Sequence, residues 1–557
     1  MPYDLRFEPW IPYRRQSGRL EWGGIALLAD DLAGDPVVAL AAPRPDFNGA
    51  LTEFLIGMMS AALVPADEED WLEAWRNPPE PAALESALRT LPPAFALDGD
   101  ETRFLQDLTD ADFTDQDISP IERLLFDSPG EQTLKLNKDL FVKRERTDRL
   151  GRPAAAMALL TMQTYAPAGG QGNRTSLRGG GPLTTIVDPR VAASGNTDEQ
   201  PLWEKIWANI ETIEGWQKRA LPSHPTTPDS LFPWIVPTRK SDPKSGGTPT
   251  TPADGHPLQV YFGMPRRIRL EFAEAGVCGL TGLPDDRTVT GFKMRNYGIQ
   301  YSAWRHPLSP HYRPRAGAEW LPVHAQPGGV GWKDWVGLTL EDAEDGREPA
   351  KTVEQFQLRG RVLGARLVRV HAFGVDFDNM KCRAWNDASV PLFVTPGADK
   401  LQLLNAAATR LTRGGDLAAA MLVIYVKAVL FAEPEEAQGD FSEIKRRFWG
   451  ETEEPFYDAL GRLAADGSDE MTAMAEGHRF LVALTGAALG IFDQWCPLEG
   501  APPDLLRRTV KARYGLTGVF RGQSKAGGKL MKELGQSAPE KASGRKMVPA
   551  AQEEKAK

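Results

Sequence analysis

The chain has 557 residues, of which 41% are hydrophobic, and a formal net charge of −10 at pH 7. Its length exceeds that of a single typical domain, so we expect two or more domains with sizeable cores. The acidic balance excludes a uniformly basic nucleic-acid-binding surface. It leaves room for local basic loops, such as 135–152, where seven Lys and Arg face three acids.

The compartment follows from cysteine usage and hydropathy. Cys278, Cys382 and Cys496 lie far apart in the sequence, which argues against a disulfide framework. The N-terminus lacks the basic and apolar regions of a signal peptide. The most apolar stretches, 417–431 and 480–492, are shorter than the roughly 20 residues of a membrane span. We therefore expect a cytoplasmic protein.

Residues 1–395 are predicted to form one large, mixed and loop-rich α/β domain. Apolar residues at three- and four-residue spacing predict helices at 50–64 and 153–164. Pro and Gly clusters predict loops at 169–182 and 241–257. Short apolar runs predict strands at 25–28, 259–262, 268–272 and 367–370.

The composition changes after residue 396 to Ala, Leu and Arg with helical spacing. The predicted helical segments are 398–431, 439–464, 468–495 and 502–513. Four such segments with short links predict an antiparallel four-helix bundle over 396–520. Residues 521–557 carry nine Lys and Arg against four acids and few large apolar residues, which predicts a disordered basic tail. The expected fold class is α+β, with a mixed N-terminal domain followed by this bundle.

No catalytic constellation is visible in the sequence. The phosphate-binding loop G-x-x-x-x-G-K-[ST], the H-E-x-x-H motif and the G-x-S-x-G elbow are all missing. His306 and His311 could bind a metal with Cys278, but Cys278 has no C-x-x-C partner. We therefore predict no metal, no cofactor and no enzymatic activity. The alternative is a hydrolase whose Gly-rich segment binds an anionic substrate, with His306 or His311 as base.

The segment 169–185 is the most distinctive part of the chain. Six of the thirteen residues from 169 to 181 are Gly, and two are Arg. Bare backbone can approach a groove closely, while Arg174 and Arg178 attract phosphates. A flexible surface loop or a tight structural turn is the alternative interpretation.

This segment does not stand alone. The run S-L-R-G-G-G-P-L-T-T at 176–185 resembles a signature of the CasA family, the large subunit of the type I-E CRISPR complex Cascade. Further matches occur in the family's order: F-E-P-W-I-P at 7–12, S-P-I-E-R-L-L at 119–125, F-G-M-P-R-R-I at 262–268, T-G-F at 290–292 and G-V-D-F-D-N-M-K at 374–381. The agreement extends from residue 7 to about 515.

The resemblance implies a non-catalytic subunit of an RNA-guided complex. Such a subunit recognises the protospacer-adjacent motif (PAM) in duplex DNA, starts strand separation and helps recruit a helicase-nuclease. Its partners are the other Cascade subunits, the guide RNA and double-stranded target DNA. The guide reads the target sequence, so the protein needs only a short duplex checkpoint.

The resemblance also implies which residues contact the PAM, from the minor-groove side. The candidates are a Gly-rich loop and the residues shortly after T-G-F: Ala168, Gly169, Gly170, Gln171, Gly172 and Arg174, then Lys293, Arg295 or, in strict register, Asn296. In some relatives Gly stands at the positions of Ala168 and Gln171.

Two further family elements map onto this chain. A hairpin that wedges beneath the PAM corresponds to Asp378, Asn379 and Met380; the alternative is a strand-to-helix turn capped by Asp378. A loop that anchors the subunit to the complex in the family corresponds here to Phe141, Lys143, Arg144, Arg146 and Arg149. The alternative is that these residues form a solvated charged loop. Some relatives carry paired cysteines near the position of Cys278 that could hold zinc; one is present here, so no metal is carried over.

Overall fold

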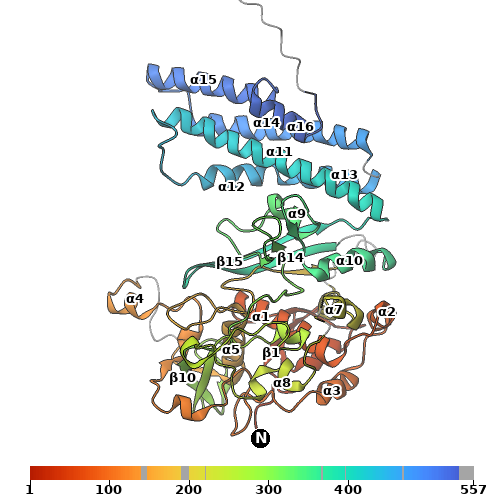
Figure 1. Ribbon diagram of the computed structural model, residues 1–557, viewed down its shortest axis with the longest axis vertical. Coiled ribbons are helices and arrows are strands. Elements are labelled where there is room, and N and C mark those ends of the chain that lie inside the picture. The colour runs from red at the N-terminus through yellow and green to blue at the C-terminus, as the bar shows by residue number, and fades with distance from the viewer. Residues whose placement is uncertain are drawn as a thin grey trace, which may run out of the picture. The chain divides into compact units, whose positions relative to one another are not determined.

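The computed structural model describes residues 1–139, 147–189, 200–219, 221, 223–364, 368–395, 397–466 and 469–537. The chain divides into two compact units, with the boundary between Pro396 and Gly397. Figure 1 shows the first unit in red to green and the second in turquoise to blue. The first unit mixes helices with small sheets, whereas the described part of the second is helical. This confirms the α+β fold class and the helical C-terminal region.

The first unit is built around two buried helices, α1 (Pro45–Ala62) and α5 (Arg152–Tyr165), which pack side by side. Both begin with a proline in the first turn, where its missing N–H costs nothing. Both are apolar on nearly all sides, as a helix inside a core must be. The other helices are α2 (Glu68–Arg76), α3 (Pro81–Thr90), α4 (Glu131–Lys135), α6 (Leu202–Trp207), α7 (Ile213–Arg219), α8 (Pro228–Leu231), α9 (Trp335–Leu338) and α10 (Lys351–Val362).

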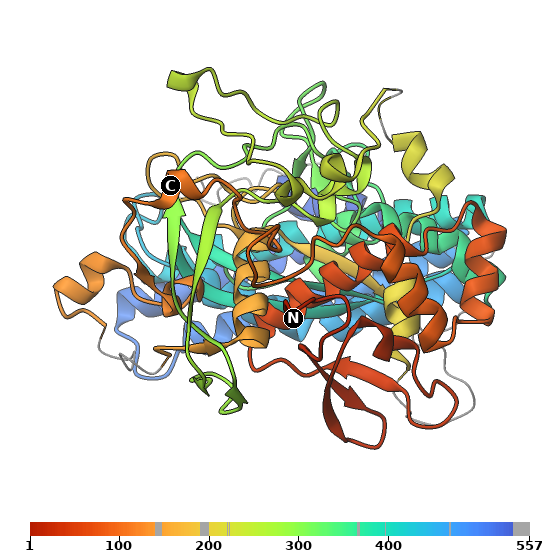
Figure 2. The ribbon, with the colours of Figure 1, turned by 90° about the horizontal axis from the view of Figure 1, so that it is seen from below.

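The strands of this unit form small antiparallel sheets. One has the order β2-β1-β3, from β1 (Ile11–Arg15), β2 (Leu20–Gly23) and β3 (Val37–Leu40). A second pairs β7 (Arg267–Ala273) with β10 (Thr288–Arg295), the ladder visible in light green in Figure 2, and adds β4 (Ser119–Pro120) and β5 (Leu150–Gly151). A third has the order β15-β14-β6, from β6 (Thr184–Asp188), β14 (Val368–Asp378) and β15 (Lys381–Leu392). The remaining strands are short: β8 (Gly276–Val277) pairs with β9 (Pro284–Asp285), and β11 (His311–Tyr312), β12 (Leu321–Pro322) and β13 (Arg347–Glu348) form a sheet in the order β12-β11-β13.

The sequence predictions for this unit are partly right. The helices expected at 50–64 and 153–164 are α1 and α5. The strand expected at 268–272 falls on β7, and residues 368–370 of the strand expected at 367–370 fall on β14. The strands expected at 25–28 and 259–262 are wrong, because both runs lie in 3₁₀ helices, Ile25–Ala29 and Pro257–Tyr261. Periodicity cannot separate a short buried strand from a single buried helical turn.

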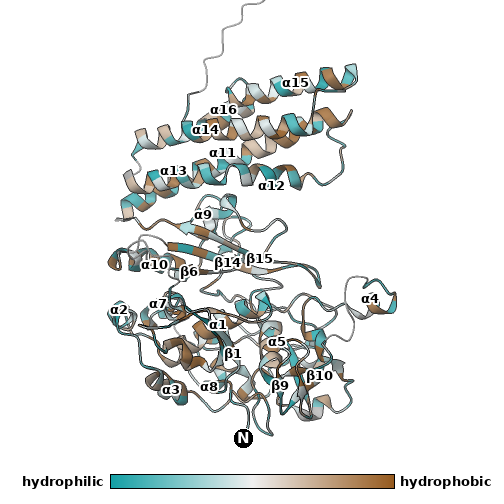
Figure 3. Ribbon diagram, turned by 180° about the vertical axis from the view of Figure 1, so that it is seen from behind, coloured by the Kyte–Doolittle hydropathy of each residue, from teal (hydrophilic) through white to brown (hydrophobic). Residues whose placement is uncertain are grey.

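The second unit is a set of helices that run lengthwise beside one another (Figure 1). They are α11 (Ala398–Leu430), α12 (Ser442–Glu451), α13 (Glu453–Asp466), α14 (Glu470–Trp495), α15 (Pro503–Phe520) and α16 (Lys525–Glu533). Helix α11 contacts each of the others. Figure 3 shows hydrophobic and hydrophilic residues mixed along these helices, as expected of amphipathic elements. The segment predicted as one helix at 439–464 is two, α12 and α13.

The prediction of a disordered tail from residue 521 is wrong for 525–533, which form α16. Leu530 and Leu534 are buried, and Ser524 caps the helix by accepting a hydrogen bond from the Gly527 N–H. Leu534 sits where a Cβ on Gly414 of α11 would lie 2.6 Å from its Cδ2. The absence of a side chain at Gly414 leaves the space that the Leu534 side chain fills.

Within the described ranges, each helix is too short or too polar to cross a bilayer.

Candidate nucleic-acid interface

The Gly-rich segment begins where α5 ends and divides into two parts. Residues 176–181 form a tight turn, in which Ser176 Oγ donates to the Gly179 carbonyl at 2.6 Å. Gly181 has a positive φ of 70° and packs directly against the Val375 carbonyl of β14, where a side chain has no room. The structural-turn interpretation therefore holds for this part. Residues 168–172, which we call the reading loop, are different: Ala168, Gly170 and Gln171 are exposed.

One side of the reading loop contacts the end of β10. The Tyr297 N–H donates to the Gly172 carbonyl at 2.8 Å, and a Cβ on Gly172 would lie 2.8 Å from Asn296 Cβ. The Arg174 guanidinium lies over the Tyr297 ring, 5.6 Å from its centroid, and donates to Ser241 Oγ and the Ser241 carbonyl, both at 2.8 Å. The reading loop is therefore fixed to the strand that carries the second family element.

The other side of the reading loop contacts the tip of the β14–β15 hairpin. A Cβ on Gly169 would lie 2.5 Å from Met380 Sδ. The Met380 side chain is nevertheless 60% exposed. The loop therefore joins the segment after T-G-F to the proposed wedge, although these three segments are far apart in the sequence.

Residues 374–381 form a two-stranded hairpin, so the alternative of a strand-to-helix turn is wrong. Asp378 pairs with Lys381 across the turn, and Asn379 adopts a φ of 54°, a left-handed conformation that Asn tolerates better than most residues. The base of the hairpin is anchored by Trp385, which stacks on Phe373 and meets the Tyr165 ring edge-on. The hairpin is thus packed against aromatic rings at Trp385 and exposed at its tip.

The three candidates after T-G-F differ in their surroundings. Lys293 lies 3.8 Å from Glu271, and Arg295 binds the Asp112 carbonyl and lies 3.5 Å from Asp115. Both side chains are half-buried, and their charges are already matched by acids. Asn296 is exposed and contacts the reading loop. Of the three candidates, Asn296 lies beside Gly172 of the loop, whereas Lys293 and Arg295 lie on β10.

Comparison with known proteins identifies the family of this chain. The family model of the CRISPR-associated protein Cse1 matches residues 4–488. The chain belongs to the Cse1 family. The name CasA is used for the same protein, as in a solved Thermus thermophilus CasA (Cse1) structure.

Solved structures of the family share the fold at low sequence identity. Thermobifida fusca Cse1 is 17% identical with a TM-score of 0.69, covering 96% of this chain and 98% of that one. A Thermus thermophilus CasA structure is 20% identical with a TM-score of 0.64, covering 96% and 100%. A chain of a CRISPR RNA-guided surveillance complex is 17% identical with a TM-score of 0.65, covering 93% and 99%.

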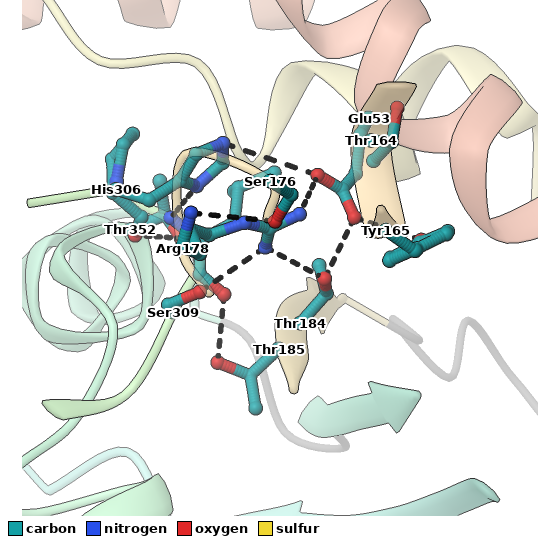
Figure 4. Close-up of polar contacts among 12 residues, drawn as sticks. Glu53, Thr164, Tyr165, Ser176, Arg178, Thr184, Thr185, His306, Ser309 and Thr352 are labelled. Carbon is teal, nitrogen blue, oxygen red and sulfur yellow. Dashed lines mark hydrogen bonds and ion pairs between the residues drawn. The ribbon is translucent and has the colours of Figure 1, made fainter. Parts of the chain in front are cut away.

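Arg178 of this Cse1-family chain is not a phosphate ligand, contrary to the expectation from its position in the Gly-rich segment. It is 4% exposed, and its Nη2 donates to Glu53 Oε2 at 2.5 Å (Figure 4). Sequence reasoning missed Glu53 altogether. Its signal was a carboxylate in the middle of the apolar helix α1, because a charged residue is rarely buried unless it is paired.

The hydrolase alternative requires a histidine base that a substrate can reach. His306 and His311 are both buried. Burial, reinforced by Arg305, lowers the pKa of His311 to about 3. Within the described ranges, no three His, Cys, Asp or Glu side chains are grouped to hold a metal ion. Cys278 is buried and is a free thiol.

The structure describes the anchoring loop only in part. Phe141, Lys143, Arg144 and Arg146 lie outside the described residues. Arg149 is half-buried, and its carbonyl accepts a hydrogen bond from the Gly279 N–H at 2.9 Å. Its guanidinium packs against Gly276. The anchoring role of this loop stays a prediction.

Proposed function

We propose that this chain is the subunit of an RNA-guided CRISPR surveillance complex that recognises the PAM in duplex DNA and starts strand separation. The observation that carries the proposal is the double contact of the reading loop, with Asn296 on one side and Met380 on the other. A duplex read by the loop would therefore meet the hairpin tip immediately beside the contacted base pairs. The solved relative described as an RNA-guided surveillance complex supports the choice of partners.

Recognition is assigned to the exposed backbone of the reading loop and to Asn296. Glycines allow the backbone to approach the floor of the minor groove, and the Asn296 amide can both donate and accept there. The minor groove distinguishes mainly A·T from G·C, so we expect a permissive PAM. Lys293 and Arg295 would exchange their carboxylate partners for phosphates, and their removal should weaken binding to every duplex.

Strand separation is assigned to Met380, supported by Asn379. An apolar side chain inserted between base steps partly unstacks them, which costs a few kcal/mol per step. Met380 is exposed, unbranched and carried on a hairpin whose base is held by Trp385. The chain itself would supply no chemistry: we expect the isolated protein neither to cut nor to unwind DNA, and a helicase-nuclease recruited by the complex to do both.

The test compares two forms of target DNA, using the complex assembled with its other subunits and guide RNA. Met380→Ala and Asn379→Gly, the latter free of strain at positive φ, should weaken binding to fully paired PAM-bearing DNA. The same variants should bind almost normally to DNA already unpaired beside the PAM, because that DNA has already met the unstacking cost.

Met471 in α14 is a matched control, since it is a methionine with 79% exposure in the other unit. Met471→Ala should leave both affinities unchanged. Equal losses on paired and unpaired DNA for the hairpin variants would show that residues 378–380 are no wedge.

A further inference from the structure

A buried polar network lies behind the reading loop, around the ion pair of Glu53 and Arg178 (Figure 4). Glu53 is 3% exposed and Arg178 4%. Arg178 Nη1 also donates to Thr184 Oγ1 at 2.9 Å and to Ser309 Oγ at 3.1 Å. The guanidinium is thus bound to three different partners.

The Glu53 carboxylate connects the reading loop with the hairpin. One oxygen accepts from Arg178, at the tight turn that supports the loop: Ser176 in that turn donates its N–H to the Ala166 carbonyl at 3.1 Å. The other oxygen accepts from Thr184 at 2.7 Å and from the Tyr165 hydroxyl at 2.8 Å.

Thr184 and Tyr165 each lead to the hairpin. Thr184 lies on β6 and is paired in register with Phe373 of β14. The Tyr165 ring packs edge-on against Trp385 of β15, 5.9 Å between centroids. Both strands of the hairpin are therefore tied to the carboxylate that holds the turn below the reading loop.

Stability alone does not account for such a pair. Replacing a buried ion pair by well-packed apolar residues is often neutral or stabilising, because desolvation offsets the Coulombic attraction. A fully satisfied network does provide directional bonds that allow one arrangement of the attached segments. Here those segments are the two proposed DNA-contacting elements.

We propose that Glu53 and Arg178 are positioning residues that hold the reading loop and the hairpin in one fixed geometry, and so set how sharply the complex discriminates a PAM. This inference rests on the proposed function. Neither residue touches DNA; each acts through the elements bonded to it.

The experiment measures PAM discrimination, the ratio of the dissociation constants for scrambled-PAM and PAM-bearing duplexes, in complexes of verified composition. Arg178→Gln should reduce this ratio by about tenfold, the size of one mismatched base pair. Thr184→Val, which keeps the shape and removes the bridging hydroxyl, should reduce it less. Tyr165→Phe, which keeps the ring on Trp385, should also give a partial loss.

Arg359→Gln is the matched control. Arg359 is 3% exposed and pairs with Glu68 at 2.8 Å, and its other contacts are the Ile210 carbonyl and the Trp71 ring. The substitution therefore removes a comparable buried arginine away from the reading loop and the hairpin. Its discrimination ratio should equal that of the wild type.

The outcomes separate this inference from the function on which it rests. Wild-type discrimination retained by Arg178→Gln, Thr184→Val and Tyr165→Phe would refute the positioning role and leave the function standing. An equal loss in Arg359→Gln would also refute it, because the effect would then be general destabilisation. If Arg178→Gln does not assemble, the two milder variants decide. A wild-type complex that does not discriminate would refute both proposals.

Discussion

Gly172→Ala is expected to reduce binding of the complex to PAM-bearing duplex DNA by about tenfold, comparable to one mismatched base pair. Gly172 has a φ of 80°, and a side chain in the left-handed region costs about 1–2 kcal/mol. The new Cβ would also lie 2.8 Å from Asn296 Cβ and 3.1 Å from the Tyr297 ring. Carbon atoms pack best at about 3.5–4.0 Å, so Asn296 has to retreat by several tenths of an ångström.

A second glycine separates strain from displacement. Gly246 has a φ of 77°, and a Cβ there would meet nothing within 4 Å. Gly246→Ala therefore carries the same backbone strain without moving a neighbour. Gly246→Ala should lower the free energy of unfolding by as much as the backbone strain in Gly172→Ala does, and it should leave DNA binding unchanged.

The assay is equilibrium binding of the assembled complexes to PAM-bearing and scrambled duplexes at one fixed salt concentration, since affinity depends steeply on salt. Gly172→Ala should lose affinity for the PAM-bearing duplex alone. The reasoning is refuted if Gly172→Ala binds this duplex like the wild type, or if Gly246→Ala weakens binding to the same extent.

Three further predictions concern other parts of the chain. Changing Lys143, Arg144 and Arg146 together to Ala should weaken assembly or lower the salt dependence of duplex binding, by a slope of about 0.9 for each phosphate that the loop no longer neutralises; an unchanged slope with normal assembly would mean a solvated loop. Leu530→Ala should lower the unfolding free energy of the C-terminal unit by about 2–5 kcal/mol, measured by denaturant melts, and no change would place α16 outside the core. Burial lowers the pKa of His311 from 6.5 to about 3, so below pH 6.5 the unfolded chain takes up a proton that the folded chain does not. The titration of His311 alone should therefore lower the free energy of unfolding by about 2 kcal/mol between pH 7 and pH 5. His311→Gln should remove this contribution from the measured pH dependence.

Local patterns in the sequence were sufficient for much of the architecture. The apolar spacing of α1 and α5, and the Ala- and Leu-rich character of residues after 396, reflect burial that each helix shows along its own length. The strand predictions at 25–28 and 259–262 are wrong because a short apolar run indicates burial but does not distinguish a strand from a helical turn. The helix at 525–533 was not predicted because its stability depends on the space above Gly414, which belongs to another helix.

In the candidate site, too, the sequence was enough for some features and the tertiary structure decided the others. The order of short motifs in the sequence was enough to indicate the family and to select the Gly-rich segment, the residues after T-G-F and the hairpin tip. Tertiary structure alone decided that these segments touch, that Asn296 rather than Lys293 or Arg295 contacts the reading loop, and that Arg178 faces Glu53 instead of DNA. The physical reason is that the position of an arginine or a glycine in the sequence does not determine which groups it will contact in the folded chain. Whether it meets a phosphate, a carboxylate or a neighbouring strand depends on residues more than a hundred positions away, which only folding brings beside it.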